Sequence, residues 1–167
     1  MNSNHIKQDV IEGMVVRMTL DGAFQRAKIY NSEAEVSDKQ RIHFRNSIAL
    51  TLESTLIKIQ AKNKYCDTEH YQTIEEFVER IGREHDNILH ENRLRIGIGQ
   101  KLINLYWKCS WILKPDITPL AHCPFDSVII KKLGSKIPWT KDINMADYQD
   151  LVRAAYLIAG HNRTIAD

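Results

Sequence analysis

The sequence has few cysteines and no long apolar run, and we expect no leader; each of these features argues against a class of protein. The three cysteines stand at positions 66, 109 and 123. They are an odd number without paired spacing, as expected of reduced thiols in a cytosol. No apolar run approaches the ~20 residues that span a bilayer. The N-terminal stretch lacks the basic and apolar regions of a signal peptide. We therefore expect a cytoplasmic protein with no membrane partner.

Glycine and proline are also scarce, at seven and four residues, and they form no linker between domains. Internal repeats and low-complexity tracts are absent as well. A chain of 167 residues fits one domain, and 43% apolar with 26% charged residues is ordinary for a folded globular protein. We predict a single domain that spans residues 1–167.

The net charge is only +2, but acidic and basic residues are distributed unevenly along the sequence. Residues 65–92 contain eight acids and two arginines, whereas residues 93–114 contain five bases and no acid. Residues 39–64 contain six bases and one acid. The basic segments could mark an anionic partner. Alternatively, the segments are solvated helix faces that attract each other across the fold.

Helical periodicity dominates the middle of the chain. Ser37 and Gln40 have capping-box spacing, and apolar residues then recur at helical intervals up to a stop at Asn63. Thr73 and Glu76 repeat that spacing and predict a second amphipathic helix that ends near residue 90. A third helix is expected over residues 100–113. It is apolar nearly all round, which places it at the centre of the domain.

The C-terminal third predicts an extended loop and two more helices. The loop is expected at the three prolines Pro115, Pro119 and Pro124. Asp126 then has the position of an N-cap, and Phe125 and Ile130 have the spacing of a hydrophobic staple. Gly134 is placed to end that helix. A last amphipathic helix runs from Tyr148 to Ala159 and stops at the next glycine.

The first segment, residues 6–30, has two interpretations. Asp21-Gly22 could form the turn of a β-hairpin or could separate two short helices. Ala23 and Ala27 are poor strand residues and favour helices. Together these patterns predict an all-α domain of five to seven helices around the helix at residues 100–113.

The segment RIGIGQK, residues 95–101, resembles the hairpin of the helix-hairpin-helix DNA glycosylase superfamily, whose members carry a Gly-hydrophobic-Gly-x-Lys segment. Two glycines allow a tight turn with outward amides, and the next helix offers its N-terminus to a phosphate. The resemblance and the neighbouring bases imply DNA as a partner. The residues expected to contact nucleic acid are Arg93, Arg95, Gly97, Gly99, Gln100 and Lys108.

The resemblance also implies a pair of catalytic residues. In bifunctional members the lysine after the second glycine attacks the sugar C1′ and forms a Schiff base, and here it is Lys101. A mostly apolar helix with Arg95 and Lys108 nearby would lower the pKa of that lysine. Cys123-Pro124-Phe125-Asp126 matches the family's loop of Val-Pro-Val-Asp type. By that match Asp126 would hold the lysine or stabilise the oxocarbenium-like sugar, and its place at a helix N-terminus keeps it ionised.

The implied function is a small DNA-binding protein that acts as a DNA glycosylase and abasic-site lyase without a cofactor. One alternative is a non-enzymatic helical interaction protein, in which Lys101 and Asp126 are only structural. Another is a HEPN-like ribonuclease, because Arg80 and His85 have the Arg-x4-His spacing of that class. No metal is expected, since His122, Cys123 and Cys109 lack the CxxC or HxxxH spacing of a four-ligand zinc site.

Overall fold

The protein is all-α, as the sequence predicts. The computed structural model describes residues 3–62, 65–114, 117, 122–135, 137, 143–160 and 165. Within these residues it forms six α-helices and no strand. They are α1 (Ser3–Phe24), α2 (Asp38–Gln60), α3 (Asp67–Glu84), α4 (Ile96–Leu113), α5 (Ser127–Lys132) and α6 (Met145–Ala159), with 3-10 turns at Asp86–Ile88 and His90–Asn92. The expected stop at Asn63 and the prolines at 115 and 119 lie outside the described residues.

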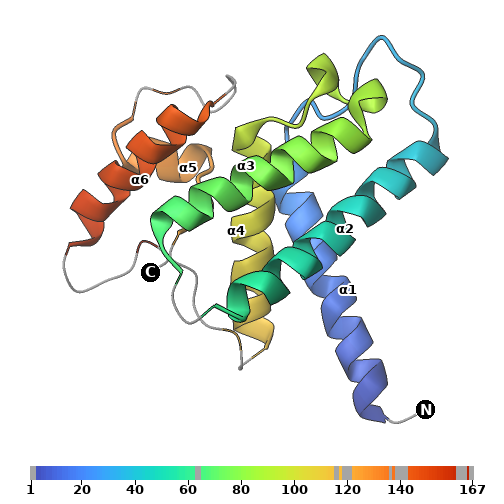
Figure 1. Cartoon of the computed structure of the whole chain (residues 1–167), viewed down its shortest axis with the longest axis horizontal. Helices are drawn as coiled ribbons and strands as arrows, with labels where there is room; N and C mark the ends of the chain where they lie inside the picture. Colours follow the sequence, from blue (N-terminus) through green and yellow to red (C-terminus); the bar gives the residue numbers. More distant parts are fainter. Residues whose placement is uncertain are drawn as a thin grey trace.

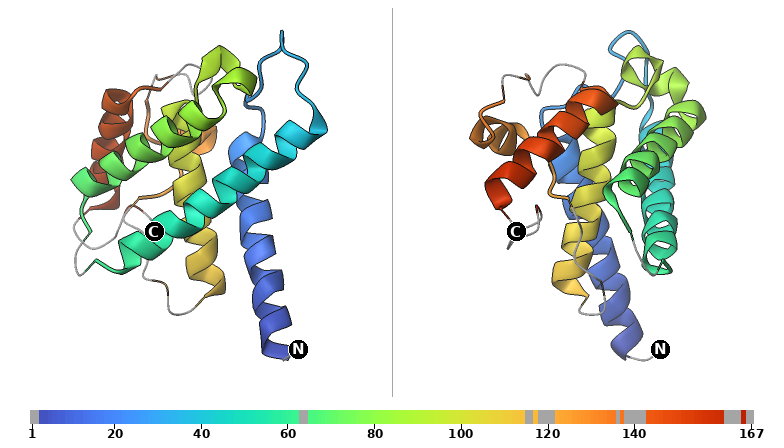
Figure 2. Two further views of the ribbon diagram at one scale, coloured as in Figure 1. Left: turned by 45° about the vertical axis from the view of Figure 1, so that its right-hand side comes forward. Right: turned by 60° about the vertical axis from the view of Figure 1, so that its left-hand side comes forward.

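Helix α4 is the centre of the fold, and this confirms the prediction drawn from its apolar residues. Ten of its residues are buried, more than in any other described helix. Helices α2 and α3 lie side by side on one side of it, α1 runs along a second side, and α5 and α6 lie on a third (Figure 1). The right-hand view of Figure 2 shows α4 between the layer of α2 and α3 and the layer of α5 and α6.

Helix α1 is continuous, so the favoured helical interpretation of this segment is correct, but neither a break nor the alternative hairpin turn forms at Asp21-Gly22. It packs antiparallel to α4, with an ion pair of 2.9 Å between Glu12 and Lys114 at one end. At the other end a Cβ on Gly22 would lie only 3.0 Å from the Leu105 side chain. The glycine therefore allows a close approach of two helices and does not turn the chain.

The capping signals correctly located the starts of α2 and α5 but not that of α3. Ser37 and Gln40 form the predicted capping box of α2. Helix α3 begins at Asp67, six positions before Thr73, and its capping box is formed by Cys66 and Glu69. The Thr73 hydroxyl instead donates to the Glu69 carbonyl at 2.8 Å, a bond made within a helix.

The end of α3 also differs from the prediction. The helix stops at Glu84, and the following residues form the two 3-10 turns before α4 begins. Glu91 and Asn92 have φ angles of 56° and 54°, in the left-handed region that ends regular helix. None of the described helices is long and apolar enough to cross a membrane.

Candidate functional site

The two glycines of the RIGIGQK segment lie inside α4, so the predicted tight turn is wrong. The helix begins at Ile96, and the amides of Ile98 and Gly99 both donate to the Arg95 carbonyl at 3.0 Å. A Cβ on Gly99 would lie 2.2 Å from Cγ2 of Val78. Gly99 is buried and allows α3 and α4 to touch, so it is not available to a phosphate.

Gln100 is also buried, and it joins α4 to the loop before α5. Its Nε2 donates to the Phe125 carbonyl at 2.8 Å, and its Oε1 accepts from the Phe125 amide at 3.1 Å. The side chain is 1% exposed. Direct contact between Gln100 and nucleic acid therefore does not fit this placement. We call this pair of bonds the Gln100 clamp.

The Gln100 clamp places Lys101 near Asp126, because each residue directly follows a member of the clamped pair. Burial lowers the pKa of the Lys101 ammonium, while the carboxylate of Asp126 acts in the opposite direction. Both side chains are half-buried. The structure thus brings the two predicted catalytic residues within electrostatic range of each other.

Asp126 is the N-cap of α5, as predicted. Its Oδ1 accepts from the amides of Val128 and Ile129, each at 2.9 Å. Phe125 and Ile130 are buried on either side of the cap, consistent with the predicted staple. Gly134 follows the helix with a φ of +67°, a conformation that favours glycine. The carboxylate is therefore held in place by backbone as well as by its position after Phe125.

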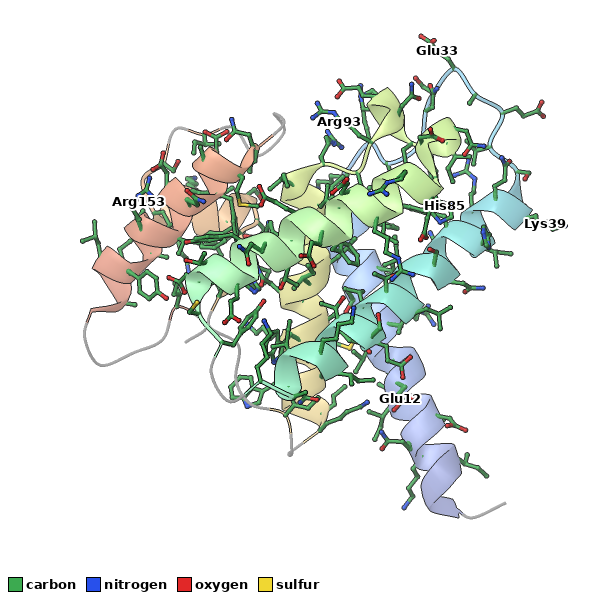
Figure 3. All side chains as sticks on the ribbon, in the orientation of Figure 1. Glu12, Glu33, Lys39, His85, Arg93 and Arg153 are labelled. Carbon is green, nitrogen blue, oxygen red and sulfur yellow. The ribbon has the colours of Figure 1, made fainter. Side chains whose placement is uncertain are left out.

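The remaining predicted nucleic-acid contacts are spread along α4 and the segment before it. Nη2 of Arg93 pairs with Oε2 of Glu91 at 2.9 Å, and Arg93 projects from the 3-10 turns (Figure 3). Nη2 of Arg95 donates to the Lys28 carbonyl at 2.7 Å. Lys108 is exposed, two turns beyond Lys101 on the same face of the helix. The structure therefore does not gather these residues into one cluster.

Arg93 lines an open cavity of about 600 Å³ between α3, the segment that leads into α4 and the start of α6. The cavity carries charges of both signs. Its charged residues are Glu75, Glu79, Arg83, Asp86 and Arg93. This mixture does not favour an anionic ligand, since acids outnumber bases around it.

A network of buried polar side chains, which the sequence patterns did not reveal, joins α3, α4, α6 and the loop before α5. Nε2 of His70 lies 2.9 Å from Oδ1 of Asn104. Nδ2 of Asn104 donates to the Tyr148 hydroxyl and to the Cys123 carbonyl, each at 3.2 Å. Nδ1 of His122 lies 2.9 Å from the same hydroxyl, and the two imidazole centroids are 4.4 Å apart. Asn104 on an otherwise apolar helix was the available signal, because a buried amide needs partners.

The network reaches the surface at Asp67. Oδ1 of Asp67 accepts from the Tyr156 hydroxyl at 2.9 Å and lies 3.0 Å from Nε2 of His122. Burial lowers the pKa of His122 despite the opposing effect of Asp67. Burial also lowers the pKa of His70 well below its ordinary range. Both imidazoles are therefore neutral at pH 7, and the network serves to join helices.

Arg80 and His85 do not share an exposed site. Nε of Arg80 pairs with Oε1 of Glu84 at 3.0 Å. His85 is 4% exposed and packs against the rings of His43 and Phe44, at the end of α3 (Figure 3). An acid or base in catalysis must reach its substrate, so this geometry gives no support to a HEPN-like ribonuclease.

The described histidines and cysteines do not form a metal site. No group of three His, Cys, Asp or Glu side chains within the described ranges is placed to hold a metal ion. Burial raises the pKa of the Cys123 thiol to about 11 and also raises that of Cys109. Both thiols are therefore protonated at neutral pH, the form that binds metals poorly.

No protein-family model, curated protein or solved structure matches this chain.

Proposed function

We propose that the protein binds DNA and acts on it as a glycosylase and abasic-site lyase, with Lys101 as the nucleophile and Asp126 as its assisting carboxylate. The main support is the proximity of Lys101 and Asp126 and the partial burial of the lysine. The Lys101 amine has a lowered pKa, and the charge of Asp126 acts on it across the Gln100 clamp. A lysine must lose its proton before it attacks carbon, so burial makes the reactive form easier to reach at neutral pH.

The proposed reaction uses the aldehyde that an abasic site presents at C1′. The neutral amine of Lys101 forms a C–N bond to that carbon, and the carbonyl oxygen leaves as water with the two amine protons. Loss of a C2′ proton from the resulting imine then expels the 3′-phosphate by β-elimination. Hydrolysis of the imine finally returns the free lysine. Asp126 stabilises the protonated imine by its negative charge.

Exposed cations near the pair supply the proposed contacts to phosphates. Lys108 shares the face of α4 that carries Lys101. Lys131 and Lys132 are exposed on α5, about one and a half turns beyond its N-cap. Each phosphate that such a cation neutralises releases counterions, so DNA affinity should fall with rising salt at a slope near −0.9 per phosphate contacted.

The proposal is tested by trapping the imine. Borohydride reduction in the presence of abasic duplex DNA should link the wild-type protein covalently to the DNA. Lys101→Ala should give no adduct, whereas the matched control Lys108→Ala should still give one, with weaker binding. Asp126→Asn should bind DNA but turn over slowly, and it should keep its stability because asparagine is also a good N-cap.

Two results would contradict the enzyme proposal. One is the absence of any wild-type adduct over a panel of abasic and damaged duplexes. The other is an adduct that persists in Lys101→Ala, which would show that a different lysine reacts. Circular dichroism of each variant must show an intact helical fold. DNA binding that is undetectable at ~50 mM salt would remove the nucleic-acid partner altogether.

The second candidate is a non-enzymatic helical interaction protein that pairs with a second copy of itself through α1. Four large apolar side chains form an exposed row at four-residue spacing, each at least half exposed: Ile6, Val10, Met14 and Met18. Such a row is unusual on a solvated helix face. Antiparallel pairing of two α1 helices about Met14 would set Val10 against Met18 and Lys7 against Asp21, so that opposite charges meet.

This second candidate is tested by light scattering coupled to gel filtration. A dimer at micromolar concentration is expected for the wild type. Met14→Glu should give a monomer, because two carboxylates would meet on the two-fold axis. Leu157→Glu, a change at an 87% exposed position on α6, is the matched control and should leave the dimer intact. A monomeric wild type at every concentration would exclude the pairing.

A further inference from the structure

A second, smaller cavity lies between α2 and α3. Its volume is about 160 Å³. The C-terminal half of α2 and the middle of α3 form its walls, and Figure 1 shows these two helices side by side. An ion pair of 2.7 Å between Lys62 and Glu69 joins the two helices where the chain passes from one to the other. The cavity is therefore part of the rigid contact between two long helices.

The lining of this cavity is rich in cations and hydroxyl groups. Three cations, Lys58, Lys62 and Arg80, stand against one acid, Glu76. Four hydroxyl-bearing residues complete the polar part: Thr51, Ser54, Thr55 and Thr73. Lysine and arginine side chains make the charge-assisted hydrogen bonds by which proteins hold phosphate. Bases outnumber acids among these lining residues, unlike in the larger cavity beside Arg93, although Glu69 and Glu84 just outside the lining offset two of the three cations.

One of the lining residues has an unsatisfied polar atom. Thr51 is 4% exposed, and its hydroxyl oxygen is buried without a hydrogen-bond partner among the described residues. By contrast, the hydroxyls of Ser54 and Thr55 donate to the Thr51 carbonyl at 3.0 and 2.7 Å. Because this oxygen is inaccessible to water, a guest in the cavity does not reach it, and the unpaired hydroxyl only destabilises the contact between the two helices.

Two of the cations are held in place by carboxylates that lie outside the lining. Lys62 pairs with Glu69, and Arg80 pairs with Glu84 at 3.0 Å. Glu84 in turn accepts from the Ser47 hydroxyl of α2 at 2.8 Å. Both cations are therefore directed toward the region of the cavity by a neighbouring carboxylate, although their side chains remain partly exposed.

We propose that this cavity binds a phosphoryl group, held by Lys58, Lys62 and Arg80. The volume of the cavity limits the size of the ligand that it can hold. Sites that enclose a whole drug-sized ligand measure roughly 300–1,000 Å³, so a space of about 160 Å³ accepts a small oxyanion while any attached molecule stays outside. The group is either inorganic phosphate or the terminal phosphate of a monoester, and both present the same oxygens to the cations.

The cavity is separate from the Lys101–Asp126 pair. Helix α4 lies between the layer of α2 and α3 and the layer that carries α5, as the right-hand view of Figure 2 shows. The phosphoryl site is therefore independent of the proposed lyase reaction, and either can fail without the other.

The experiment is a titration of the full chain, followed by nuclear magnetic resonance of the backbone amides at constant ionic strength. The probes are inorganic phosphate, a nucleoside 5′-monophosphate and a 5′-phosphorylated single-stranded oligonucleotide. Saturable shifts are expected at residues 51–62 and 73–80. Equal affinity for all three identifies free phosphate as sufficient, whereas at least tenfold tighter binding of a monoester identifies the ester as the ligand.

Single substitutions test the assignment. Arg80→Gln and Lys58→Gln should each weaken phosphate binding about tenfold, since each loses a charge-assisted hydrogen bond. Lys39→Gln makes the same charge change at the far end of α2 (Figure 3) and should leave affinity unchanged. Thr51→Val removes a hydroxyl that a guest does not reach, so it should leave phosphate binding unchanged while the phosphate-free protein melts at the same or a higher temperature. Shifts that never saturate, or an equal loss in Lys39→Gln, would overturn the proposal.

Discussion

At Gly99 the backbone of α4 comes so close to α3 that no side chain fits. A Cβ there would lie 2.2 Å from Cγ2 of Val78, a β-branched side chain with little rotational freedom. Glycine in a helix interior normally costs ~1 kcal/mol relative to alanine. At this position the contact between two helices outweighs that cost, because any larger residue would push them apart.

We therefore predict that Gly99→Ala destabilises the protein by about 1–3 kcal/mol, although alanine is the better helix former. Urea denaturation measures this change in the free energy of unfolding. Val78→Ala alone should be mildly destabilising, and the double variant should be more stable than Gly99→Ala. If Gly99→Ala is neutral or stabilising, the close approach of α3 and α4 at this point is wrong.

Helix α4 has more buried residues than any other described helix, and its central position was predicted from the sequence. Its apolar residues point in several directions, so a central position was the only arrangement that could bury them. Trp107 is 5% exposed and faces α2 across a space of about 10 Å³. Trp111, one turn later, is 38% exposed, because the helix by then leaves the cover of α2 and α3.

The two tryptophans give a matched test of this element. Trp107→Ala should reduce the free energy of unfolding by roughly 3–5 kcal/mol, since its removal leaves a large cavity. Trp111→Ala should cost less than ~1 kcal/mol, because its side chain is already in contact with water. Equal losses in the two variants would show that α4 is buried differently along its length.

The starts of helices were predictable where a cap residue had an unambiguous partner, as at Ser37 and Asp126. The start of α3 was not, because Thr73 and Glu76 have the same spacing as a capping box while lying inside the helix. At α1, Asp21-Gly22 is a common turn sequence, and only packing on α4 shows that the helix continues. Capping patterns describe hydrogen bonds between residues that are close in sequence. Whether a helix continues through such a pattern depends on its packing against residues that are distant in sequence.

The candidate site shows the same limit of prediction from local sequence patterns. Lys101 and Asp126 were predicted from a family resemblance, but their proximity depends on the Gln100 clamp, which no spacing rule reveals. The pairing of His70 with His122 likewise joins distant segments. Conversely, Gly99 and Gln100 were expected to face DNA and are buried instead. A motif names residue types, and only the fold decides which of them remain exposed.

The stability of the whole molecule depends on pH, because the buried His70 and His122 belong to the network that joins three helices. Burial lowers the pKa of His70 well below its ordinary value, and that of His122 is lowered too. Among the groups around them, Asp67 favours a charged His122 and the amide oxygen of Asn104 favours a charged His70, but burial has the larger effect on both imidazoles. Protonation of either ring therefore opposes the fold.

We predict that stability is full above pH ~6.5 and falls as the pH drops below that value. The unfolded chain then binds protons that the folded chain cannot, at a cost of up to ~1.4 kcal/mol per pH unit for each histidine. Chemical denaturation at a series of pH values between 7.5 and 5 measures the slope. The double variant His70→Gln with His122→Gln should flatten it, and an unchanged slope in that variant would refute the assignment.

The pairing of α1 with α4 also has a consequence for how the chain is made. Glu12 and Lys114 are 102 positions apart in sequence. At ~5–20 residues per second, α1 leaves the ribosome several seconds or more before the last turn of α4 has been translated. During that interval both sides of α1 are exposed, the side that will bind α4 and the row that begins at Ile6. The nascent chain thus exposes these apolar side chains before their partner exists, and the packing of α1 waits for α4.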